Sequence, residues 1–407
     1  MKNEQKTITN ANEVRQSKPN VPTLRFSNKS IREKKRIKDF CEVNPKTEEL
    51  DDEFIYIDLE SVSKGCLLSK NIISKTNAPS RAQRVLKNND ILFQCVRPYQ
   101  MNNLLFNAEN TDFQYVASTG YAQIRTQENP SYVYQLLHSP NFNKEVMLRC
   151  TGSSYPAISS SDLEDIEVCI CGIEEQQKIG YFLDLIDRRI AVQNKIISDL
   201  KVLKKELCNR YFKSVHNDTS LGCVTLKDIL TERKEYCSKD GTFTHGTLSK
   251  EGVSPKTERY DRDFLVKNED KQYKVTHFND ICYNPANLKF GVICRNTYGD
   301  LIFSPIYVTF EIADTVYPAY IELFLTNANF IGRIRRYEQG TVYERMAVYP
   351  EDFLSYETRM PIYEDQVKFA DKIQRIQDKI ELETLFLNYL QKQRKYLLNA
   401  MFIQTWR

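Results

Sequence analysis

Two stretches of the 407-residue chain decide its organisation: EEQQKIGYFLDLIDRRIAVQNKIISDLKVLKKELCNRYF at residues 174–212 and EDQVKFADKIQRIQDKIELETLFLNYLQKQRKYLLNAMF at residues 364–402. They align without a gap, because every position in the first lies 364 − 174 = 190 residues before its counterpart in the second. Self-similarity at a fixed spacing indicates an internal repeat. The identical pairs include Gln176 and Gln366, Ile186 and Ile376, and Phe212 and Phe402.

Both stretches have the apolar spacing of long paired helices. Their apolar residues recur at steps of three and four, and the series is interrupted at the same place in both copies, by Gln193 and Glu383. At ~1.5 Å per residue, 39 residues span roughly 58 Å. We predict that the two helices pair antiparallel, although two ordinary core helices in separate domains are the alternative. The predicted seam comprises Ile179, Leu183, Ile186, Ile190, Ile197, Leu200, Phe369, Ile373, Ile376, Ile380, Leu387 and Leu390.

The segments before each helix have mixed patterns, with short β-rich runs followed by helical spacing. The predicted strands are Phe54–Leu59, Asp90–Val96, Tyr121–Arg125, Asp280–Asn284, Gly291–Arg295 and Ile302–Phe310. The predicted helices are Tyr132–Leu137, Phe142–Leu148 and Tyr320–Thr326. The repeat extends into these segments, because Asn89-Asp90-Ile91 matches Asn279-Asp280-Ile281 at the same separation of 190.

We therefore predict a mixed α/β (α+β) fold in which two globular domains are separated by two long, antiparallel, coiled-coil-like helices, with a pseudo-two-fold internal repeat. The predicted segments are an N-terminal arm at 1–33, a first domain at 34–173, a central helix at 174–214, a second domain at 215–363 and a distal helix at 364–407.

Composition excludes several classes of protein. Net charge is +3, from 57 basic and 54 acidic residues, which excludes a histone-like binder but leaves local basic patches open. Residues 1–38 are such a patch, because eleven Lys and Arg against three Glu give a net charge of 11 − 3 = +8. This segment reads as a flexible arm that either solubilises the chain or touches nucleic acid. No apolar run approaches the ~18 residues of a membrane span, and no signal peptide is visible. The 11 scattered Cys suit reduced thiols, so we expect a cytoplasmic protein.

At this point the sequence resembles the specificity (S) subunit of type I restriction-modification systems, over about residues 34–404. The resemblance rests on the two-fold repeat and on four stretches in the first half. These are Asn89-Asp90-Ile-Leu-Phe93 with Arg97 downstream, Ser118-Thr-Gly-Tyr-Ala122, Gly152-Ser-Ser-Tyr-Pro-Ala-Ile-Ser-Ser-Ser-Asp-Leu163 and Glu175-Gln-Gln-Lys-Ile-Gly-Tyr-Phe-Leu183. The second half departs more, with Glu344-Arg345-Met346 where Pro-Ala-Ile is expected.

The resemblance implies a non-catalytic DNA-specificity subunit with two target recognition domains, each reading one half of a split site on double-stranded DNA. It implies that the paired helices dock methyltransferase (modification) subunits, two in number, and that restriction translocase/nuclease subunits join through them. S-adenosylmethionine and ATP/Mg are then expected on those partners, and no cofactor is expected on this chain.

Sequence readout needs Arg, Asn or Gln at base edges and Lys or Arg on phosphates. The run Arg333–Arg336 reads equally well as a helix end whose cations face the dipole. Each of the other candidates taken singly reads more readily as plain surface charge. The candidate DNA-binding residues are Arg81, Arg84, Arg97, Tyr99, Gln100, Ser153, Ser154, Tyr155, Lys250, Arg295, Asn296, Arg333, Arg335, Arg336 and Arg345.

Catalytic and metal-binding patterns are missing from the sequence. Asn284-Pro285-Ala286-Asn287 lacks the second Pro and the aromatic residue with which amino-methyltransferases hold a flipped base, and no glycine-rich loop suits a cofactor. The four His show no HExxH, and no paired CxxC motif suggests zinc. We predict no catalytic residues and no metal. The alternative functions are a protein-interaction scaffold that clamps a partner without reading DNA, and a solitary modification enzyme.

Overall fold

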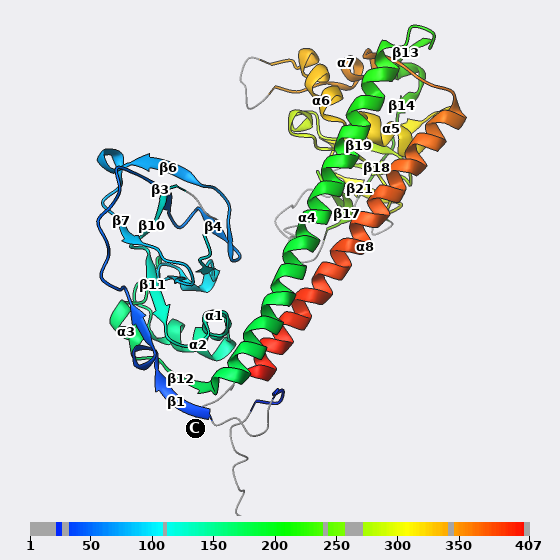
Figure 1. Ribbon diagram of the computed structural model, residues 1–407. Helices are drawn as coiled ribbons and strands as arrows, with labels where there is room; N and C mark the ends of the chain where they lie inside the picture. The colour runs from blue at the N-terminus through cyan, green and yellow to red at the C-terminus, as the bar shows by residue number, and fades with distance from the viewer. Residues whose placement is uncertain are drawn as a thin grey trace, which may run out of the picture. The chain divides into compact units, whose positions relative to one another are not determined.

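The computed structural model describes residues 22–26, 32–108, 112–238, 243–256, 272–340 and 346–402. The chain divides into two compact units: unit 1 comprises residues 1–193 and 386–407, and unit 2 comprises residues 194–385. Two long helices, α4 (Ile173–Asn217, 45 residues) and α8 (Tyr363–Met401, 39 residues), each contribute one part to each unit (Figure 1). Both helices begin within a residue of the predicted positions.

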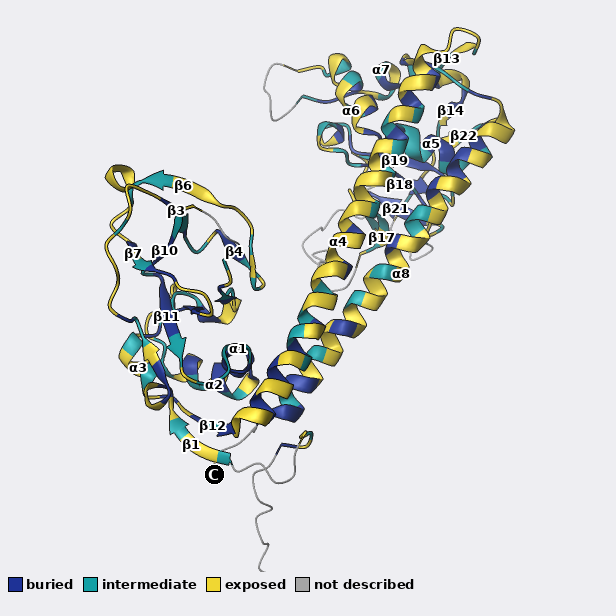
Figure 2. Ribbon diagram, in the orientation of Figure 1, coloured by how far each residue is buried: buried dark blue, intermediate teal, exposed yellow. Residues whose placement is uncertain are grey.

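The predicted seam residues of α4 and α8 meet in both units. In unit 1, Leu183 lies in one buried cluster with Leu397 and Met401 from the end of α8. In unit 2, the ring of Tyr211, near the end of α4, stacks on that of Phe369, near the start of α8, with centroids 3.6 Å apart. The helices therefore run antiparallel, as predicted. All twelve predicted seam residues are buried or half-buried, whereas most residues between them are exposed (Figure 2).

A polar pair crosses between the two helices at the same repeat position in both units. In unit 1, Arg394 of α8 donates to the carboxylate of Asp187 of α4. In unit 2, Lys204 of α4 donates to the amide oxygen of Gln377 of α8 over 2.9 Å. Each residue lies 190 positions from its counterpart, so the repeat preserves the cross-helix contact while replacing an ion pair with a neutral acceptor. Gln193, the polar interruption of the seam, is also buried.

Each unit carries two sheets with the same strand order. In unit 1 the orders are β6-β3-β10-β7 and β2-β11-β8-β9; in unit 2 they are β17-β16-β21-β18-β15 and β14-β22-β19-β20. In each first sheet the pairing β3·β10 or β16·β21 is parallel, and its neighbours are antiparallel. The two small ladders β1·β12 and β13·β23 also correspond. The main sheets of the two units therefore have the same topology. β15 is an additional strand in unit 2, and the β4·β5 pair of unit 1 has no counterpart among the described residues of unit 2.

The strands of unit 1 are β1 (Arg32–Arg36), β2 (Cys41–Val43), β3 (Glu53–Ile57), β4 (Val62–Ser63), β5 (Cys66–Leu67), β6 (Asn71–Ser74), β7 (Ala82–Val85), β8 (Ile91–Gln94), β9 (Leu104–Leu105), β10 (Gln114–Ser118), β11 (Tyr121–Thr126) and β12 (Glu167–Cys171). Its helices are α1 (Pro130–Leu137), α2 (Pro140–Arg149) and α3 (Ser160–Glu164), with short 3-10 turns η1 (Ile37–Asp39), η2 (Lys75–Asn77) and η3 (Pro98–Gln100).

The strands of unit 2 are β13 (Cys223–Thr225), β14 (Leu230–Glu232), β15 (Tyr236–Cys237), β16 (Thr244–Ser249), β17 (Gly252–Pro255), β18 (Tyr273–Thr276), β19 (Ile281–Tyr283), β20 (Ile293–Arg295), β21 (Leu301–Phe303), β22 (Val308–Ile312) and β23 (Glu357–Arg359). Its helices are α5 (Pro318–Leu325), α6 (Ala328–Ile334) and α7 (Pro350–Leu354), with 3-10 turns η4 (Leu226–Asp228), η7 (Leu288–Phe290) and η8 (Arg335–Tyr337).

Two sequence predictions need correction. The single strand predicted over Ile302–Phe310 is two strands, β21 and β22, separated by a turn in which the Tyr307 amide donates to the Ser304 carbonyl over 3.1 Å. Pro305 lies inside that turn and cannot donate to a ladder. The predicted arm at 1–33 extends too far, because its last two residues lie in β1, which pairs with β12.

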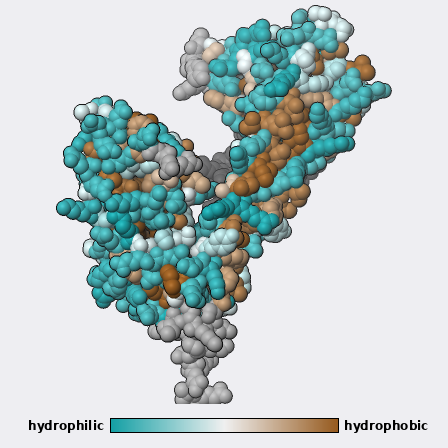
Figure 3. All heavy atoms as spheres, viewed as in Figure 1, coloured by the Kyte–Doolittle hydropathy of each residue, from teal (hydrophilic) through white to brown (hydrophobic). Residues whose placement is uncertain are grey.

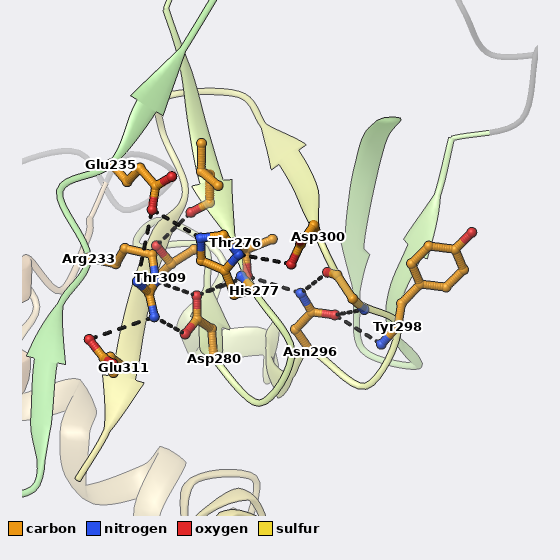
Figure 4. Close-up of polar contacts among 12 residues, drawn as sticks. Arg233, Glu235, Thr276, His277, Asp280, Asn296, Tyr298, Asp300, Thr309 and Glu311 are labelled. Carbon is orange, nitrogen blue, oxygen red and sulfur yellow. Dashed lines mark hydrogen bonds and ion pairs between the residues drawn. The ribbon is translucent and has the colours of Figure 1, made fainter. Parts of the chain in front are cut away.

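A buried aspartate recurs in the two units. Asn89 and Asn279 both have φ of 72°, a left-handed conformation that Asn tolerates better than other residues with a Cβ. The next residue, Asp90 or Asp280, is buried and accepts a hydrogen bond from the backbone three positions earlier. Asp280 also forms a two-pronged ion pair with Arg233, at 2.8 and 3.0 Å (Figure 4).

The arginine that neutralises this aspartate comes from a different strand in each unit. In unit 1, Arg125 of β11 donates twice to Asp90, at 2.8 Å each. In unit 2, Arg233 follows β14, which corresponds to β2 rather than β11. The charge of the buried aspartate is therefore balanced in both units, but by arginines at positions that do not correspond. For this reason the aspartate–arginine ion pair does not show in an alignment of the two halves.

A buried glutamine fastens each long helix to its unit. Gln176 accepts from the Asn129 amide at 3.1 Å and donates to the Cys171 carbonyl at 2.7 Å. Gln366 accepts from the Tyr317 amide at 2.8 Å and donates to the Pro361 carbonyl at 2.8 Å. In both units the glutamine therefore joins the start of the long helix to the start of α1 or α5, which explains the repeated Gln structurally.

Gly180 allows α4 to approach the start of α1. A Cβ at this position would lie 2.8 Å from Asn129 Oδ1 and 2.8 Å from the Tyr132 amide nitrogen. We expect Gly180→Ala to lower the free energy of unfolding of unit 1 by about 1–3 kcal/mol, measured by urea unfolding. The control is Gly332→Ala in α6, where a Cβ meets nothing within 4 Å and helix propensity predicts a gain of roughly 0.5–1 kcal/mol. Equal effects of the two substitutions would contradict the close approach.

None of the helices in the described ranges combines the length and the apolar character needed to cross a membrane.

Candidate nucleic-acid interface

The turn η3, between β8 and β9, presents three of the predicted residues. Arg97, which precedes Pro98, has φ of 54°, and Met101, which follows Gln100, has φ of 53°. Two residues with a Cβ in the left-handed region within five positions are costly, and such strain clusters at functional sites. Tyr99 and Gln100 are exposed between them.

Gln94 at the end of β8 holds this turn in place. Its buried side chain donates from Nε2 to Gln100 Oε1 over 2.9 Å and accepts from the Asn102 amide at 3.1 Å. Its own backbone amide donates to Asn103 Oδ1 over 2.8 Å. These hydrogen bonds fix the strained turn to the end of β8. The side chains of Arg97 and Tyr99 take no part in them.

A second loop brings Tyr155 onto Arg97. The Arg97 amide donates to the Pro156 carbonyl over 2.7 Å, and its guanidinium carbon lies 4.3 Å from the Tyr155 ring centroid. Tyr155 is 65% exposed, and Ser153 and Ser154 beside it are exposed as well. The structure therefore gathers six predicted residues from two loops into one surface, which we call the η3 surface: Arg97, Tyr99, Gln100, Ser153, Ser154 and Tyr155.

His138 supports the η3 surface from the core. Its Nδ1 donates to the Tyr134 carbonyl over 2.7 Å. Its Nε2 lies 3.4 Å from the side-chain amide nitrogen of Asn103, Nδ2. The ring is therefore neutral, and Nε2 accepts the hydrogen bond from Asn103. Burial lowers the pKa of His138 to about 4. Protonation would place an unpaired charge in the core and remove the acceptor that holds Asn103.

This lowered pKa predicts an acid-sensitive unit 1. A depressed histidine pKa contributes stability that is present above the unfolded pKa of about 6.5 and is lost as pH falls through the folded value. From pH 7 to pH 4 we expect this residue to cost unit 1 about 3 kcal/mol. His138→Gln should flatten that part of the pH dependence, measured by urea unfolding between pH 7 and 4.5. Parallel curves for wild type and variant would contradict the assignment.

The remaining candidates of unit 1 lie on β7 and next to it. Arg81 is exposed just before the strand, and its carbonyl accepts from the Thr119 amide. Arg84 is half-buried on the strand; its Nε is buried without a hydrogen-bond partner, and burial lowers its pKa.

Unit 2 has a counterpart of the η3 surface at η7. The Ile158 amide donates to the Cys95 carbonyl at 3.1 Å, and the Val348 amide donates to the Pro285 carbonyl at 3.3 Å. The two donors are 190 residues apart in the sequence, and so are the two acceptors. The bridges Thr151↔Ala157 and Gln339↔Ala347 also correspond. The turn that follows Cys95 is η3, and the turn that follows Pro285 is η7.

The residues at η7 were missed by the sequence analysis. Phe290 is 52% exposed, and Lys289 Nζ lies 5.3 Å from its ring centroid. Unit 2 therefore presents a cation beside an aromatic ring where unit 1 presents Arg97 beside Tyr155. A strict comparison at a separation of 190 would have identified Lys289 and Phe290 opposite Tyr99 and Gln100.

Two predicted residues of unit 2 are used inside the fold. Asn296 is fully buried; its amide donates to Thr276 Oγ1 and the Gly299 carbonyl, and its oxygen accepts from the Tyr298 and Gly299 amides (Figure 4). The prediction that it contacts DNA is wrong for this reason. Arg295 donates to Glu322 at 3.0 Å and to Asn279 at 2.9 Å, so its role is structural.

The other candidates of unit 2 are spread over several elements. Lys250 is exposed in the turn between β16 and β17. Arg335 pairs with Glu338 at 3.5 Å, and Arg336 donates back to the Arg333 carbonyl at 3.0 Å, because α6 ends at Ile334 and η8 follows. Arg345 lies outside the described residues.

His277 joins two acidic loops beside the buried aspartate of unit 2. Its Nδ1 lies 2.8 Å from Asp300 Oδ1 and its Nε2 lies 3.0 Å from Glu235 Oε2 (Figure 4). Burial alone would lower the pKa of His277, but the hydrogen bonds to Asp300 and Glu235 outweigh it and raise the pKa. These groups do not form a metal site, and no cluster of three or more potential metal ligands occurs among the described residues.

The cations of β1 and η1, at the start of unit 1, form ion pairs with acidic residues. Arg32 pairs with Glu175 at 3.1 Å, Lys34 pairs with Glu167, and Lys38 pairs with Asp165 at 2.6 Å. The hydrogen bond from Lys38 lowers the pKa of Asp165. These cations hold β1 to β12 and α3 rather than forming an open basic patch.

The long helices carry apolar residues outside their seam. Along α4 they recur at steps of four and seven, as in Tyr181, Leu185 and Val192. Figure 3 shows hydrophobic side chains gathered on the visible face of the two helices. In unit 1 the exposed set is Ile173, Tyr181, Leu185, Val192, Phe386, Tyr389 and Tyr396, and in unit 2 it is Ile196, Val202, Leu203, Tyr363, Leu382 and Leu385.

Comparisons with known proteins agree with the fold and with the repeat. Residues 31–202 match the family described as the type I restriction modification DNA specificity domain. The type I restriction enzyme HindI specificity subunit of Haemophilus influenzae is 23% identical over 163 residues, which are 39% of this chain and 35% of that protein. The match therefore spans about a third of the curated relative's length.

Two solved structures share the fold over nearly the whole chain. One, from a study of assembly and conformational transition in the type I R-M system, has a TM-score of 0.58 and 16% identity, covering 92% of this chain and 98% of its own. The S subunit of the type I restriction-modification system from M. genitalium has a TM-score of 0.55 and 15% identity, covering 94% and 99%. Residues 31–202 therefore match a type I restriction modification DNA specificity domain, and the whole chain shares its fold with two solved type I restriction-modification structures.

Proposed function

We propose that this chain is the DNA-reading subunit of a type I restriction-modification enzyme, in which each unit reads one half of a bipartite duplex target. The observation that carries the proposal is a pair of similar surfaces. In unit 1, Arg97 at η3 lies beside Tyr155 from a second loop, and in unit 2, Lys289 lies beside Phe290 at η7, the turn that corresponds to η3. Arg and Lys read guanine edges and phosphates, and exposed aromatic rings contact bases and sugars. Two copies on one chain suit a target in two parts.

We propose further that the exposed apolar residues of α4 and α8 dock methyltransferase subunits. Each unit has its own set, which favours two such subunits, one per unit. Exposed apolar patches on a helix pair mark protein interaction sites. Restriction subunits would then join through the methyltransferases, and the complex would act on cytoplasmic DNA.

The chain itself is proposed to catalyse nothing. S-adenosylmethionine and ATP with Mg²⁺ are assigned to the partner subunits, because the polar residues at the η3 surface and at η7 suit recognition and not group transfer. Incubating the purified chain with tritiated S-adenosylmethionine and duplex DNA should give no transfer. Transfer by the chain alone would establish a solitary modification enzyme instead.

The proposal is tested by selecting duplexes from a random library with the chain in complex with its methyltransferase. We expect two short specified blocks separated by a fixed unspecified gap. Binding to the selected duplex should weaken with salt, with a log–log slope near −0.9 for each phosphate contacted. A salt-independent complex with no selected blocks would indicate a protein scaffold that does not read DNA.

A further inference from the structure

A cavity of about 270 Å³ opens at the end of α4 in unit 2. This is below the roughly 300 Å³ at which pockets begin to take drug-sized molecules, and it leaves room for a small anion with its water. The cavity is built from the last turn of α4, from α6 and from β23. Its polar lining is Lys213, His216, Asn217, Asn327, Asn329, Arg333, Tyr356 and Thr358.

Cations from several elements converge on this cavity. Burial lowers the pKa of His216, and the nearby cations Arg333, Arg359 and Arg336 lower it further. Within the described ranges, neither Arg333 nor Lys213 forms an ion pair with a carboxylate. Arg359 donates to the Leu221 carbonyl. Asp218, which follows α4, lies in electrostatic range of Arg359, but its carboxylate accepts from Ser220. The cavity therefore holds uncompensated positive charge.

Unit 1 supplies an internal comparison, because the same elements form a cavity there. Asn141 and Phe142 line it where Asn329 and Phe330 line the cavity of unit 2, at a separation of 188. At that same separation Glu145 stands opposite Arg333, and Glu167 adds a second carboxylate. The unit 1 cavity measures about 20 Å³. Both carboxylates of unit 1 are ion-paired, Glu145 with Arg149 and Glu167 with Lys34. In the described ranges of unit 2, Arg333 lines a larger cavity and has no carboxylate partner.

We propose that the unit 2 cavity binds a phosphate group through Arg333, Lys213 and His216, with Asn329 and Thr358 as neutral donors. Arginine presents a planar fork that matches phosphate oxygens, and charge-assisted bonds of this kind are about twice as strong as neutral ones. The phosphate comes either from the backbone of bound DNA or from a free phosphate compound, and the chemistry of the site is the same for both.

The test follows the imidazole signal of His216 by NMR in the full-length chain. Inorganic phosphate is added at constant ionic strength against chloride, and a short duplex is added in a separate arm. A bound phosphate compensates the surrounding cations, so the pKa of His216 should rise. A rise with inorganic phosphate supports a free phosphate ligand, and a rise with the duplex alone supports a backbone phosphate. No rise in either arm overturns the proposal.

Arg333→Gln should weaken the phosphate effect about tenfold or more, since a hydrogen bond to a charged group is lost. Arg333→Lys should restore part of it, and Glu145→Gln in unit 1 should leave it unchanged. Lys213→Gln, at an exposed position, serves if Arg333→Gln does not fold. The inorganic phosphate arm contains no DNA, so its result does not depend on the proposed DNA reading.

Discussion

Replacing Asp90 with alanine is expected to destabilise unit 1 by about 3 kcal/mol, the largest effect that the structure predicts for a single residue. Asp90 is 1% exposed and accepts from Arg125, from Gln123 and from the Lys87 amide. Its removal leaves Arg125 without its partner and the turn after β7 without its acceptor. Breaking a buried pair by removing one partner costs about 3–5 kcal/mol, and the partial exposure of Arg125 places the expected value at the lower end.

Two matched variants sharpen this experiment. Asp280→Ala should have a smaller effect in unit 2, because Arg233 also pairs with Glu235 and Glu311, at 3.9 and 3.7 Å. Asp165→Ala removes an exposed carboxylate that pairs with Lys38, and should cost less than about 1 kcal/mol. Urea unfolding gives the free energies, and hydrogen exchange of backbone amides assigns each loss to its unit. If Asp90→Ala were as mild as Asp165→Ala, the buried pair would contribute no more to folding than a surface ion pair does.

Replacing Arg97 with alanine is expected to have the largest effect on target binding. The contact that a guanidinium makes with a base edge is worth about 1–3 kcal/mol of discrimination, so the affinity for the selected target should fall by roughly 5- to 150-fold. The loss should map to one block of the target. Binding to the same target with altered bases in that block should fall much less, since the lost contact no longer distinguishes them.

The corresponding variant in unit 2 is Lys289→Ala, which should affect the other block. Lys38→Ala serves as the control, because Lys38 is a cation of unit 1 already paired with Asp165. Competition binding with duplexes altered in each block separates the effects. A uniform loss across all sequences would show that Arg97 and Lys289 contact phosphates alone, and no loss would place the interface elsewhere.

The parts of the fold that depend on local periodicity were predictable from sequence. The seam of α4 and α8 follows from apolar steps of three and four, and the strands β8 and β11 follow from β-rich runs bounded by turn residues. The strand at Ile302–Phe310 was wrong because the apolar pattern was read across Pro305, whose missing amide marks the turn.

The candidate site was predictable only in unit 1, where the stretches that resemble the family include Arg97 and Tyr155, although their contact was not predicted. In unit 2 the selection of base-reading residue types favoured Arg295 and Asn296, whose side chains form hydrogen bonds within the fold instead. Whether a side chain faces a turn or solvent depends on tertiary contacts that spacing does not encode. The counterpart at Lys289 and Phe290 became clear through the hydrogen bonds from Ile158 to Cys95 and from Val348 to Pro285.

The claim that each unit reads one half of a split target is tested most directly by exchanging one unit's recognition segment. Residues 34–173 would be replaced by the same segment of a relative with a different target, and the methylated bases would then be mapped in cells that also produce the methyltransferase. The account predicts that one block of the recognised sequence changes while the other block, read by unit 2, is retained. A change in both blocks, or a single continuous recognised sequence, would contradict it.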